Sequence, residues 1–472
     1  MNRLSSHWRW PLAALVVVLL ATIMTVWRYR LPPVMDENAE GFSAARAMVT
    51  LQRLLPDGRP HPRGSPELEA VQQRLVEILE EIGVRPEVRR AEACSPFGPC
   101  GVVQNIQVHF PGETDEVVLF SAHTDSVATG PGAGDDGHGV AILVELARHL
   151  QKLDHRNGVT LLFTDGEEQG LMGAVAFVEG NPLAARVGAA VNIEARGQSG
   201  LSTLFRTAGE DAWLIDAYAE HAPRPFTSSV HQVVFETMPH YTDLSVWESF
   251  GMAGVDFAFI DRPEAYHTEL DRVDLLEPRS VQSQGENALA MLEGLMDADL
   301  AHPPRGHAGW FDVMGLFVVR WPRPWTLWFC LGWTGVVVGR CWTQRKAGAV
   351  RLRGLGAGLL VVLVALLTSA LVAWGLSQAP FTLHRWPAAG LVLVVSLMAM
   401  MSIGGLFAQV SVSGLHLATC LFAALTGLGV SLLWPGVAHL LVVPSLFAGM
   451  GWLAERRCRL RAATWEIGRA HV

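Results

Sequence analysis

Long apolar runs without any interior charge are the feature that most constrains this chain. About 20 such residues are enough to cross a bilayer as a helix. One run lies near the start and five lie in the last third, at 11–27, 325–339, 355–376, 388–407, 414–433 and 436–453. No small-x-small cleavage site follows the first run, so we interpret it as an uncleaved anchor. We therefore expect a tail and transmembrane anchor in residues 1–33 and an all-α, multi-span membrane domain in residues 306–465.

The charges divide the chain in the same way. Residues 1–312 carry 23 basic and 43 acidic side chains, whereas the remainder carries 13 basic and 2 acidic ones. No basic patch points to nucleic acid. Basic residues cluster at 340–353 and 456–461, and the positive-inside rule places both clusters in the cytoplasm. Six alternating spans then put residues 34–305 outside the cytoplasm, in the periplasm of a bacterial inner membrane or in the lumen of an endoplasmic-reticulum-type membrane.

Two of the six cysteines lie outside the membrane domain expected at residues 306–465. Cys94 and Cys100 flank the short loop "CSPFGPC", in which proline and glycine allow a tight turn. A disulfide between them fits an oxidising compartment, and two unpaired thiols are the alternative.

Apolar strands alternate with helical patterns in the outer domain, which is typical of an α/β sandwich. Residues 116–126, 158–168 and 189–197 read as strands followed by loops, and residues 139–150 read as a helix. Each polar cluster follows the carboxyl end of a strand. Binding sites of open α/β sheets form at that edge.

The polar clusters supply a mixed set of nitrogen and oxygen donors, which suits zinc. The candidates are His123 and Asp125 in "SAHTDS", Asp135 in "PGAGDDGHG", Glu168 in "GEEQG", Glu194 in "NIEARG" and His267 in "AYHTELD". Five ligands are too many for one catalytic ion that keeps a position open, but they suffice for two ions if one carboxylate bridges. Four further histidines are interpreted as structural: His138, His155, His231 and His240.

The order of the motifs "HTD", "GAGDD", "GEE", "NIEA" and "YHTELD" resembles the M28 family of zinc exopeptidases, and in particular its membrane-bound branch related to endoplasmic reticulum metallopeptidase. The segments "FSAARAMVTLQRL", "HPRGSPE" and "WFDVMGLFVVRWP" resemble that branch as well. The resemblance covers residues 41–322. It implies a three-layer α/β sandwich with a mixed central sheet. It also implies a membrane-anchored peptidase that acts on short peptides as an aminopeptidase.

The family pattern also implies roles for individual residues. One zinc ion is held by Asp135, Glu168 and His267, and a second by Asp135, His123 and Glu194. Asp125 accepts a hydrogen bond from His123 and fixes its tautomer. Tyr266 either donates to the developing oxyanion or is a packed aromatic residue. Glu194 stands where the secreted aminopeptidases of the family usually have aspartate, and the longer side chain matches the membrane branch.

Glu167 precedes the ligand Glu168 directly, and adjacent side chains in an extended chain diverge. Glu168 can therefore face a metal while Glu167 faces the substrate, where it acts as the general base. The expected partners are a peptide substrate and the lipid bilayer; the oligomeric state is left open. A glutaminyl-cyclase-like acyltransferase and a non-catalytic scaffold are the alternatives. Residues 466–472, "EIGRAHV", follow no structural logic, and we interpret them as a non-native tail.

Overall fold

The computed structural model describes residues 16, 19–20, 23–377 and 412–446. Contacts divide the chain into two units, residues 1–322 and 323–472, and each unit is considered by itself. The sequence pattern places the domain boundary after residue 305, and the division by contacts falls after residue 322.

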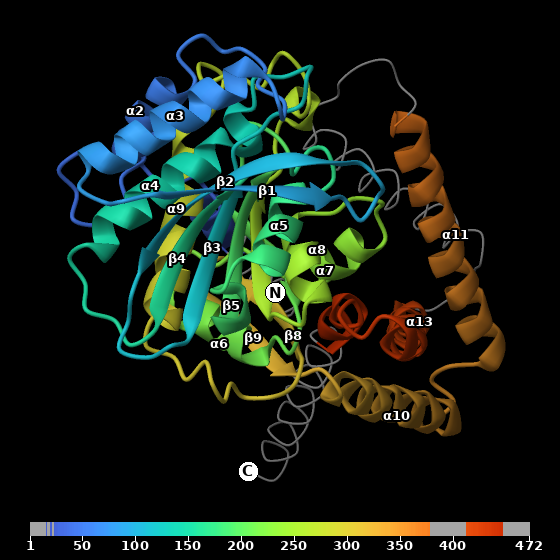
Figure 1. The fold of residues 1–472 in the computed structure, drawn as a ribbon. Helices are drawn as coiled ribbons and strands as arrows, with labels where there is room; N and C mark the ends of the chain where they lie inside the picture. The colour runs from blue at the N-terminus through green and yellow to red at the C-terminus, as the bar shows by residue number, and fades with distance from the viewer. Residues whose placement is uncertain (1–15, 17–18, 21–22, 378–411, 447–472) are drawn as a thin grey trace. The chain divides into compact units, whose positions relative to one another are not determined.

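A seven-stranded mixed sheet forms the centre of the first unit, with the strand order β1-β2-β4-β3-β5-β7-β6 (Figure 1). The strands are β1 Glu87–Cys94, β2 Cys100–Phe110, β3 Val117–His123, β4 Gly158–Thr164, β5 Val187–Ala195, β6 Thr203–Ala208 and β7 Gly254–Phe259. Strands β4, β3, β5 and β7 are parallel, and β1, β2 and β6 join the sheet antiparallel. The expected mixed sheet is therefore confirmed.

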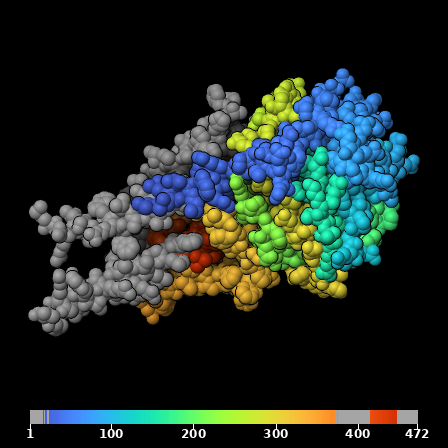
Figure 2. Space-filling model, turned by 90° about the vertical axis from the view of Figure 1, so that its left-hand side faces the viewer, coloured from blue at the N-terminus to red at the C-terminus, as the bar shows by residue number. Residues whose placement is uncertain are grey.

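Helices cover both faces of this sheet, which gives the three layers. On one side lie α2 Ala44–Leu54, α3 Pro66–Glu81, α4 His138–Leu150, α6 Ala212–His221 and α9 Pro278–Leu295. On the other lie α5 Met172–Gly180 and α8 Asp243–Ser249 (Figure 1). The remaining short elements are α7 Ser229–Glu236, η1 Ala133–Gly137, η2 Ala184–Arg186 and η3 Pro263–Ala265. Figure 2 shows the segment with α2 and α3, in blue, at the surface of the first unit.

The central strands are buried on both faces because their side chains supply two separate cores. Every residue of β3 and β4 is buried. Phe120 and Leu161 pack into the core beneath α4 and α9, whereas their neighbours Leu119 and Leu162 pack into the core beneath α5 and α8. Parallel strands between two helical layers need such continuous apolar runs. The predicted strands and the predicted helix at 139–150 are confirmed.

A hairpin explains why the first unit continues to residue 322. Strand β8, Ala308–Val313, pairs with β9, Phe317–Pro322. Trp310 of β8 is fully buried, and its indole Nε1 donates to the hydroxyl of Thr227 at 2.8 Å. This burial ties the hairpin to the rest of the first unit.

The described part of the second unit is helical, with α10 Trp325–Lys346, α11 Leu352–Ser377 and α13 Val412–Leu433. Among the described residues, one helical segment, Gly414–Leu433, is long and apolar enough to cross a bilayer, and Leu352–Thr368 is a shorter apolar helix. The run predicted at 388–407 lies outside the described residues, as do parts of the runs at 11–27 and 436–453. The multi-span arrangement stays a prediction.

Candidate metal centre

The sheet topology brings the predicted ligands to one edge. His123 is the last residue of β3, Glu168 follows β4, and Glu194 is the penultimate residue of β5. These three strands are parallel neighbours, so their carboxyl ends meet. Asp135 comes from η1 and His267 from the segment after η3. The structure thus gathers all five predicted ligands.

Asp135 lies between two groups of donors. Its Oδ1 is 3.1 Å from Nε2 of His123, and its Oδ2 is 3.1 Å from Nε2 of His267. Glu194 completes the first group, with Oε2 4.0 Å from Nε2 of His123. Glu168 completes the second, with Oε2 3.2 Å from Nε2 of His267. Within each group the candidate ligand atoms all lie within 4.8 Å of one another.

The orientation of His123 indicates that a cation belongs beside Asp135. Nδ1 of His123 lies 2.9 Å from the backbone carbonyl oxygen of Asp125, which can only accept, so Nδ1 carries the ring proton. In the neutral imidazole Nε2 then holds a lone pair, which faces Oδ1 of Asp135. A lone pair and a carboxylate oxygen repel each other unless a proton or a metal ion lies between them. The residues present therefore fit a metal site.

Burial and like charges make this cluster dependent on a positive charge. Burial raises the pKa of Glu168 to about 7, and the carboxylate of Asp135 adds to the rise. Burial, together with the nearby carboxylate of Glu167, raises the pKa of Glu194 well above its usual range. Burial alone would lower the pKa of His267, but hydrogen bonds with Asp135 and Glu168 outweigh it and raise the pKa to about 9. Metal binding displaces protons from donors of this kind.

The backbone around Asp135 is held by Asp271, a residue that the sequence analysis missed. Oδ2 of Asp271 accepts from the backbone N–H of Asp135 at 3.0 Å, and Oδ1 accepts from that of Gly134 at 2.6 Å. The side chain of Gln198 donates to the same Oδ1 at 2.6 Å. A Cβ at Gly134 would lie 2.6 Å from the carbonyl oxygen of Gly197, so this approach needs glycine. The only sequence signal was the position of Asp271 at the end of "YHTELD".

Asp125 acts differently from the prediction. Its carboxylate oxygen is 3.6 Å from Nδ1 of His123, too far for a hydrogen bond, and its backbone carbonyl orients the ring instead. The carboxylate accepts from the backbone N–H groups of Glu167, at 3.1 Å, and Glu168, at 3.3 Å. The turn after β4 leaves these two donors without a strand partner, and a carboxylate satisfies them well. Asp125 therefore orients His123 through its backbone and the glutamate pair through its side chain.

Both adjacent glutamates line a neighbouring pocket of about 590 Å³. Oε2 of Glu168 also lies 3.2 Å from Nε2 of His267, and Glu168 belongs to a candidate ligand group that does not include Glu167. The division of tasks between the two side chains stays a prediction. Glu167 is half-buried, and burial raises its pKa well above the usual range.

Tyr266 lines the same pocket. Its ring stacks on the imidazole of His267, with centroids 3.7 Å apart and planes at 19°, and the guanidinium of Arg196 lies 5.4 Å from the Tyr266 centroid. Burial and the carboxylate of Asp135 raise the pKa of Tyr266, so the phenol keeps its proton and can donate. Stacking and proton donation are therefore compatible.

The four histidines interpreted as structural lie outside both donor groups. Nδ1 of His138 is 2.6 Å from the carbonyl oxygen of Gly134, and Nδ1 of His155 is 2.6 Å from that of Asn157. His231 and His240 line the wall of the pocket. None of the four is needed to complete a candidate ligand set.

This fold and donor set define an α/β protein with a candidate two-metal site at the carboxyl edge of its parallel strands. The family model "Peptidase family M28" matches residues 105–292, which include all five candidate ligands. Residues 105–292 of the chain therefore match peptidase family M28.

Relatives with membrane-associated names share this region. The chain is 32% identical over 310 residues to endoplasmic reticulum metallopeptidase 1 of Homo sapiens. This alignment covers 60% of this chain and 34% of the human protein. It is 36% identical over 234 residues to the vacuolar membrane protease of Metarhizium robertsii, covering 44% of this chain and 22% of that protein. The chain thus spans about a third or less of the length of these two relatives.

Among solved structures, a glutaminyl cyclase of Porphyromonas gingivalis is 22% identical. The match covers 54% of this chain and 99% of the cyclase chain, with a TM-score of 0.45.

Proposed function

We propose that this protein is a membrane-anchored, dinuclear zinc peptidase that hydrolyses short peptides outside the cytoplasm as an aminopeptidase. The observation that carries the proposal is the position of Asp135. Each of its two carboxylate oxygens faces a different histidine at 3.1 Å, and each histidine has a further glutamate beside it. A carboxylate shared in this way is the arrangement that two metal ions require.

The residues have distinct tasks in this proposal. Asp135, His123 and Glu194 hold one zinc ion, and Asp135, Glu168 and His267 hold the other. Zinc, when bound, acts as a Lewis acid that lowers the pKa of water and polarises a carbonyl group.

Glu167 is the general base. Its carboxylate lines the pocket beside both donor groups, where it accepts a proton from the attacking water and returns it to the leaving amine. Its raised pKa suits a group that must hold a proton between these two transfers. Asp125 fixes the backbone of Glu167, and the protonated hydroxyl of Tyr266 donates to the developing negative charge on the peptide oxygen.

The membrane part of the proposal rests on separate observations. The segment Gly414–Leu433 is long and apolar enough to span a bilayer. Two relatives carry the endoplasmic reticulum or the vacuolar membrane in their names. The disulfide between Cys94 and Cys100 fits an oxidising compartment for the first unit.

Metal content and peptide turnover of the full chain in detergent test this proposal together. We expect about two zinc ions per chain, release of the first amino acid from unblocked tripeptides, and no turnover of the amino-blocked forms. Turnover of the amino-blocked forms would contradict the proposed aminopeptidase polarity. Cyclisation of peptides with N-terminal glutamine in place of hydrolysis would reject the peptidase assignment.

A further inference from the structure

The pocket beside the metal centre has an apolar wall that the proposed chemistry does not use. Glu167, Glu168, Glu194 and His267 are among its lining residues. The apolar lining comes from several separate segments: Phe97, Phe205, Phe226, Val234, Phe235, Met238, Tyr241 and Ile260. Its volume, about 590 Å³, is large enough for a bulky side chain next to the reacting peptide bond.

Two aromatic rings from distant parts of the sequence meet at this wall. The rings of Phe97 and Tyr241 have centroids 4.7 Å apart and planes at 44°. Both side chains are about half exposed, Phe97 at 54% and Tyr241 at 56%. Rings in such contact bury more apolar surface when a ligand covers them, so this pair can bind an apolar group.

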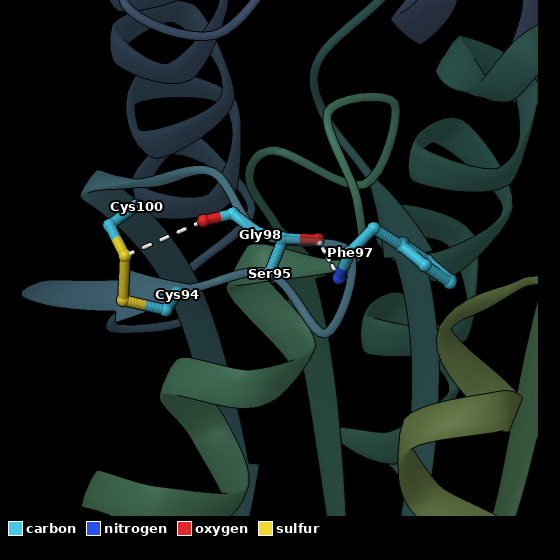
Figure 3. Close-up of a disulfide and its surroundings, with 5 residues drawn as sticks. All are labelled: Cys94, Ser95, Phe97, Gly98 and Cys100. Atoms are coloured by element: carbon cyan, nitrogen blue, oxygen red, sulfur yellow. Dashed lines mark hydrogen bonds between the residues drawn. A yellow bond between two sulfur atoms is a disulfide. The ribbon is translucent and has the colours of Figure 1, made fainter.

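The position of Phe97 is set by a loop that the disulfide closes. Cys94 ends β1 and Cys100 begins β2, and the two residues are paired in the ladder. Inside the loop, the backbone N–H of Ser95 donates to the carbonyl of Pro99 at 2.7 Å, and that of Phe97 donates to the hydroxyl of Ser95 at 3.0 Å. Figure 3 shows the Phe97 side chain pointing away from the disulfide.

The same loop rests on the turn that carries the two glutamates. Gly170 donates its backbone N–H to the carbonyl of Glu167 at 2.8 Å. A Cβ at Gly170 would lie 2.1 Å from the hydroxyl oxygen of Ser95 and 3.3 Å from the Phe97 ring, so loop and turn are in direct contact. The disulfide loop is therefore packed between the catalytic turn and Tyr241.

We infer that the loop closed by Cys94–Cys100 is a specificity wall, with Phe97 and Tyr241 forming one side of a subsite for a large aliphatic or aromatic side chain of the peptide. The disulfide holds Phe97 in place, so selectivity for apolar peptides depends on the oxidised loop. This inference rests on the proposed peptidase function.

Trileucine and trialanine test the subsite, because each carries the same side chain at every position and the pair needs no knowledge of cleavage polarity. The ratio of their kcat/KM values is measured for the full chain in detergent with zinc. Phe97→Ala and Tyr241→Ala should each reduce the trileucine-to-trialanine ratio about tenfold, within the range that apolar pockets achieve. Phe250, which is 53% exposed and lies outside the pocket lining, gives the matched control, and Phe250→Ala should leave the ratio unchanged. Equal ratios for all three variants would overturn the inference.

A double-mutant comparison tests the disulfide. Replacing both Cys94 and Cys100 by serine should lower the ratio in the wild-type background, but should change it little when Phe97 is already alanine. A general loss of stability would lower turnover of both peptides in both backgrounds. If the cysteine replacements lower the ratio as much in the Phe97→Ala background as in the wild type, the disulfide does not act through Phe97.

Binding separates this inference from the proposed function. Calorimetry of trileucine and trialanine with the zinc-loaded Glu167→Gln variant reports the subsite without turnover. Tighter binding of trileucine that is lost with Phe97→Ala, together with no peptide cleavage by the wild-type chain, would reject the peptidase proposal and keep the subsite. Cleavage of both tripeptides with equal binding would reject the subsite and keep the peptidase.

Discussion

At the scale of single residues, the adjacent glutamates show how one turn can separate two tasks. The backbone N–H groups of Glu167 and Glu168 are both held by the carboxylate of Asp125. With the backbone fixed, Glu168 meets His267 while both side chains line the pocket. Asp125 therefore supports the turn on which the proposed division of tasks depends.

Substitution of the two glutamates should produce different defects. Glu167→Gln keeps the size of the side chain and removes the proton acceptor, so we expect zinc content to stay unchanged and turnover to fall by ~10²–10⁴. Glu168→Gln removes a charged candidate ligand, so we expect zinc content itself to fall. Zinc analysis and turnover of an unblocked tripeptide are measured for both variants. Equal zinc loss in the two, or full activity of Glu167→Gln, would reject these roles.

Asp271 offers a test of the backbone support around the metal centre. Asp271→Asn places an amide where two backbone N–H groups now donate, so the segment at Asp135 should loosen. We expect zinc affinity to fall by about 10–100-fold, as is common when a group that supports a ligand is lost. Competition with a chelator measures the affinity. Asp274→Asn, at an exposed pair with Arg272, is the control and should retain the affinity of the wild type.

The residues that could be predicted are those whose position follows from local sequence. His123, Glu168 and Glu194 lie at or just after the carboxyl ends of parallel strands, and these ends must meet, so their proximity could be expected. Asp271 could not be assigned, because its partners at 134 and 135 are far away in the sequence and depend on the folded loop. The hydrogen bond expected of the Asp125 side chain was wrong for the same reason, since the competing donors at 167 and 168 come from another strand end.

At the scale of elements, the central strands and α4 could be predicted but α9 could not. Apolar residues dominate β3, β4 and α4, so their patterns are plain. Helix α9 buries polar side chains beside its apolar ones: Gln282 accepts from the backbone N–H of Ala44 at 2.9 Å, and Gln284 donates to the carbonyl of Glu194 at 2.7 Å. Partners that lie so far away leave no periodic signal in the local sequence.

Helix α9 also contains a glycine whose packing can be tested. A Cβ at Gly285 would lie 2.1–2.3 Å from three atoms of the Phe42 ring, which is itself 2% exposed and has no room to move. We expect Gly285→Ala to reduce the free energy of unfolding by about 1–3 kcal/mol, as overpacked cores do. The control is Gly180→Ala at the end of α5, where no atom lies within 4 Å of the added carbon. Thermal unfolding midpoints are compared, and equal midpoints for the two variants would contradict this packing.

At the scale of the whole molecule, the chain combines an acidic unit with a basic apolar one. Residues 1–312 hold 43 of the 45 acidic side chains, whereas the basic clusters lie between and after apolar runs. The orientation proposed for the membrane region depends on these clusters and on an even number of crossings between them. The described residues contribute one qualifying span, Gly414–Leu433.

Labelling of single cysteines tests this orientation. The cysteines outside the disulfide, Cys330, Cys341, Cys420 and Cys458, are first replaced by serine. Ala347→Cys then places a thiol after α10, in the basic loop, and avoids Gly348, whose φ of +68° disfavours a side chain. We expect an impermeant maleimide to label this thiol only after the membrane is opened, because the loop at 340–353 should face the cytoplasm. Glu113→Cys, at an exposed position of the first unit, should be labelled in intact cells if the host exports that unit to its surface, or in intact spheroplasts if it faces the periplasm. If both positions are labelled without opening the membrane, position 347 and the first unit lie on the same side. That result would reject the single crossing expected between them and the six-span arrangement.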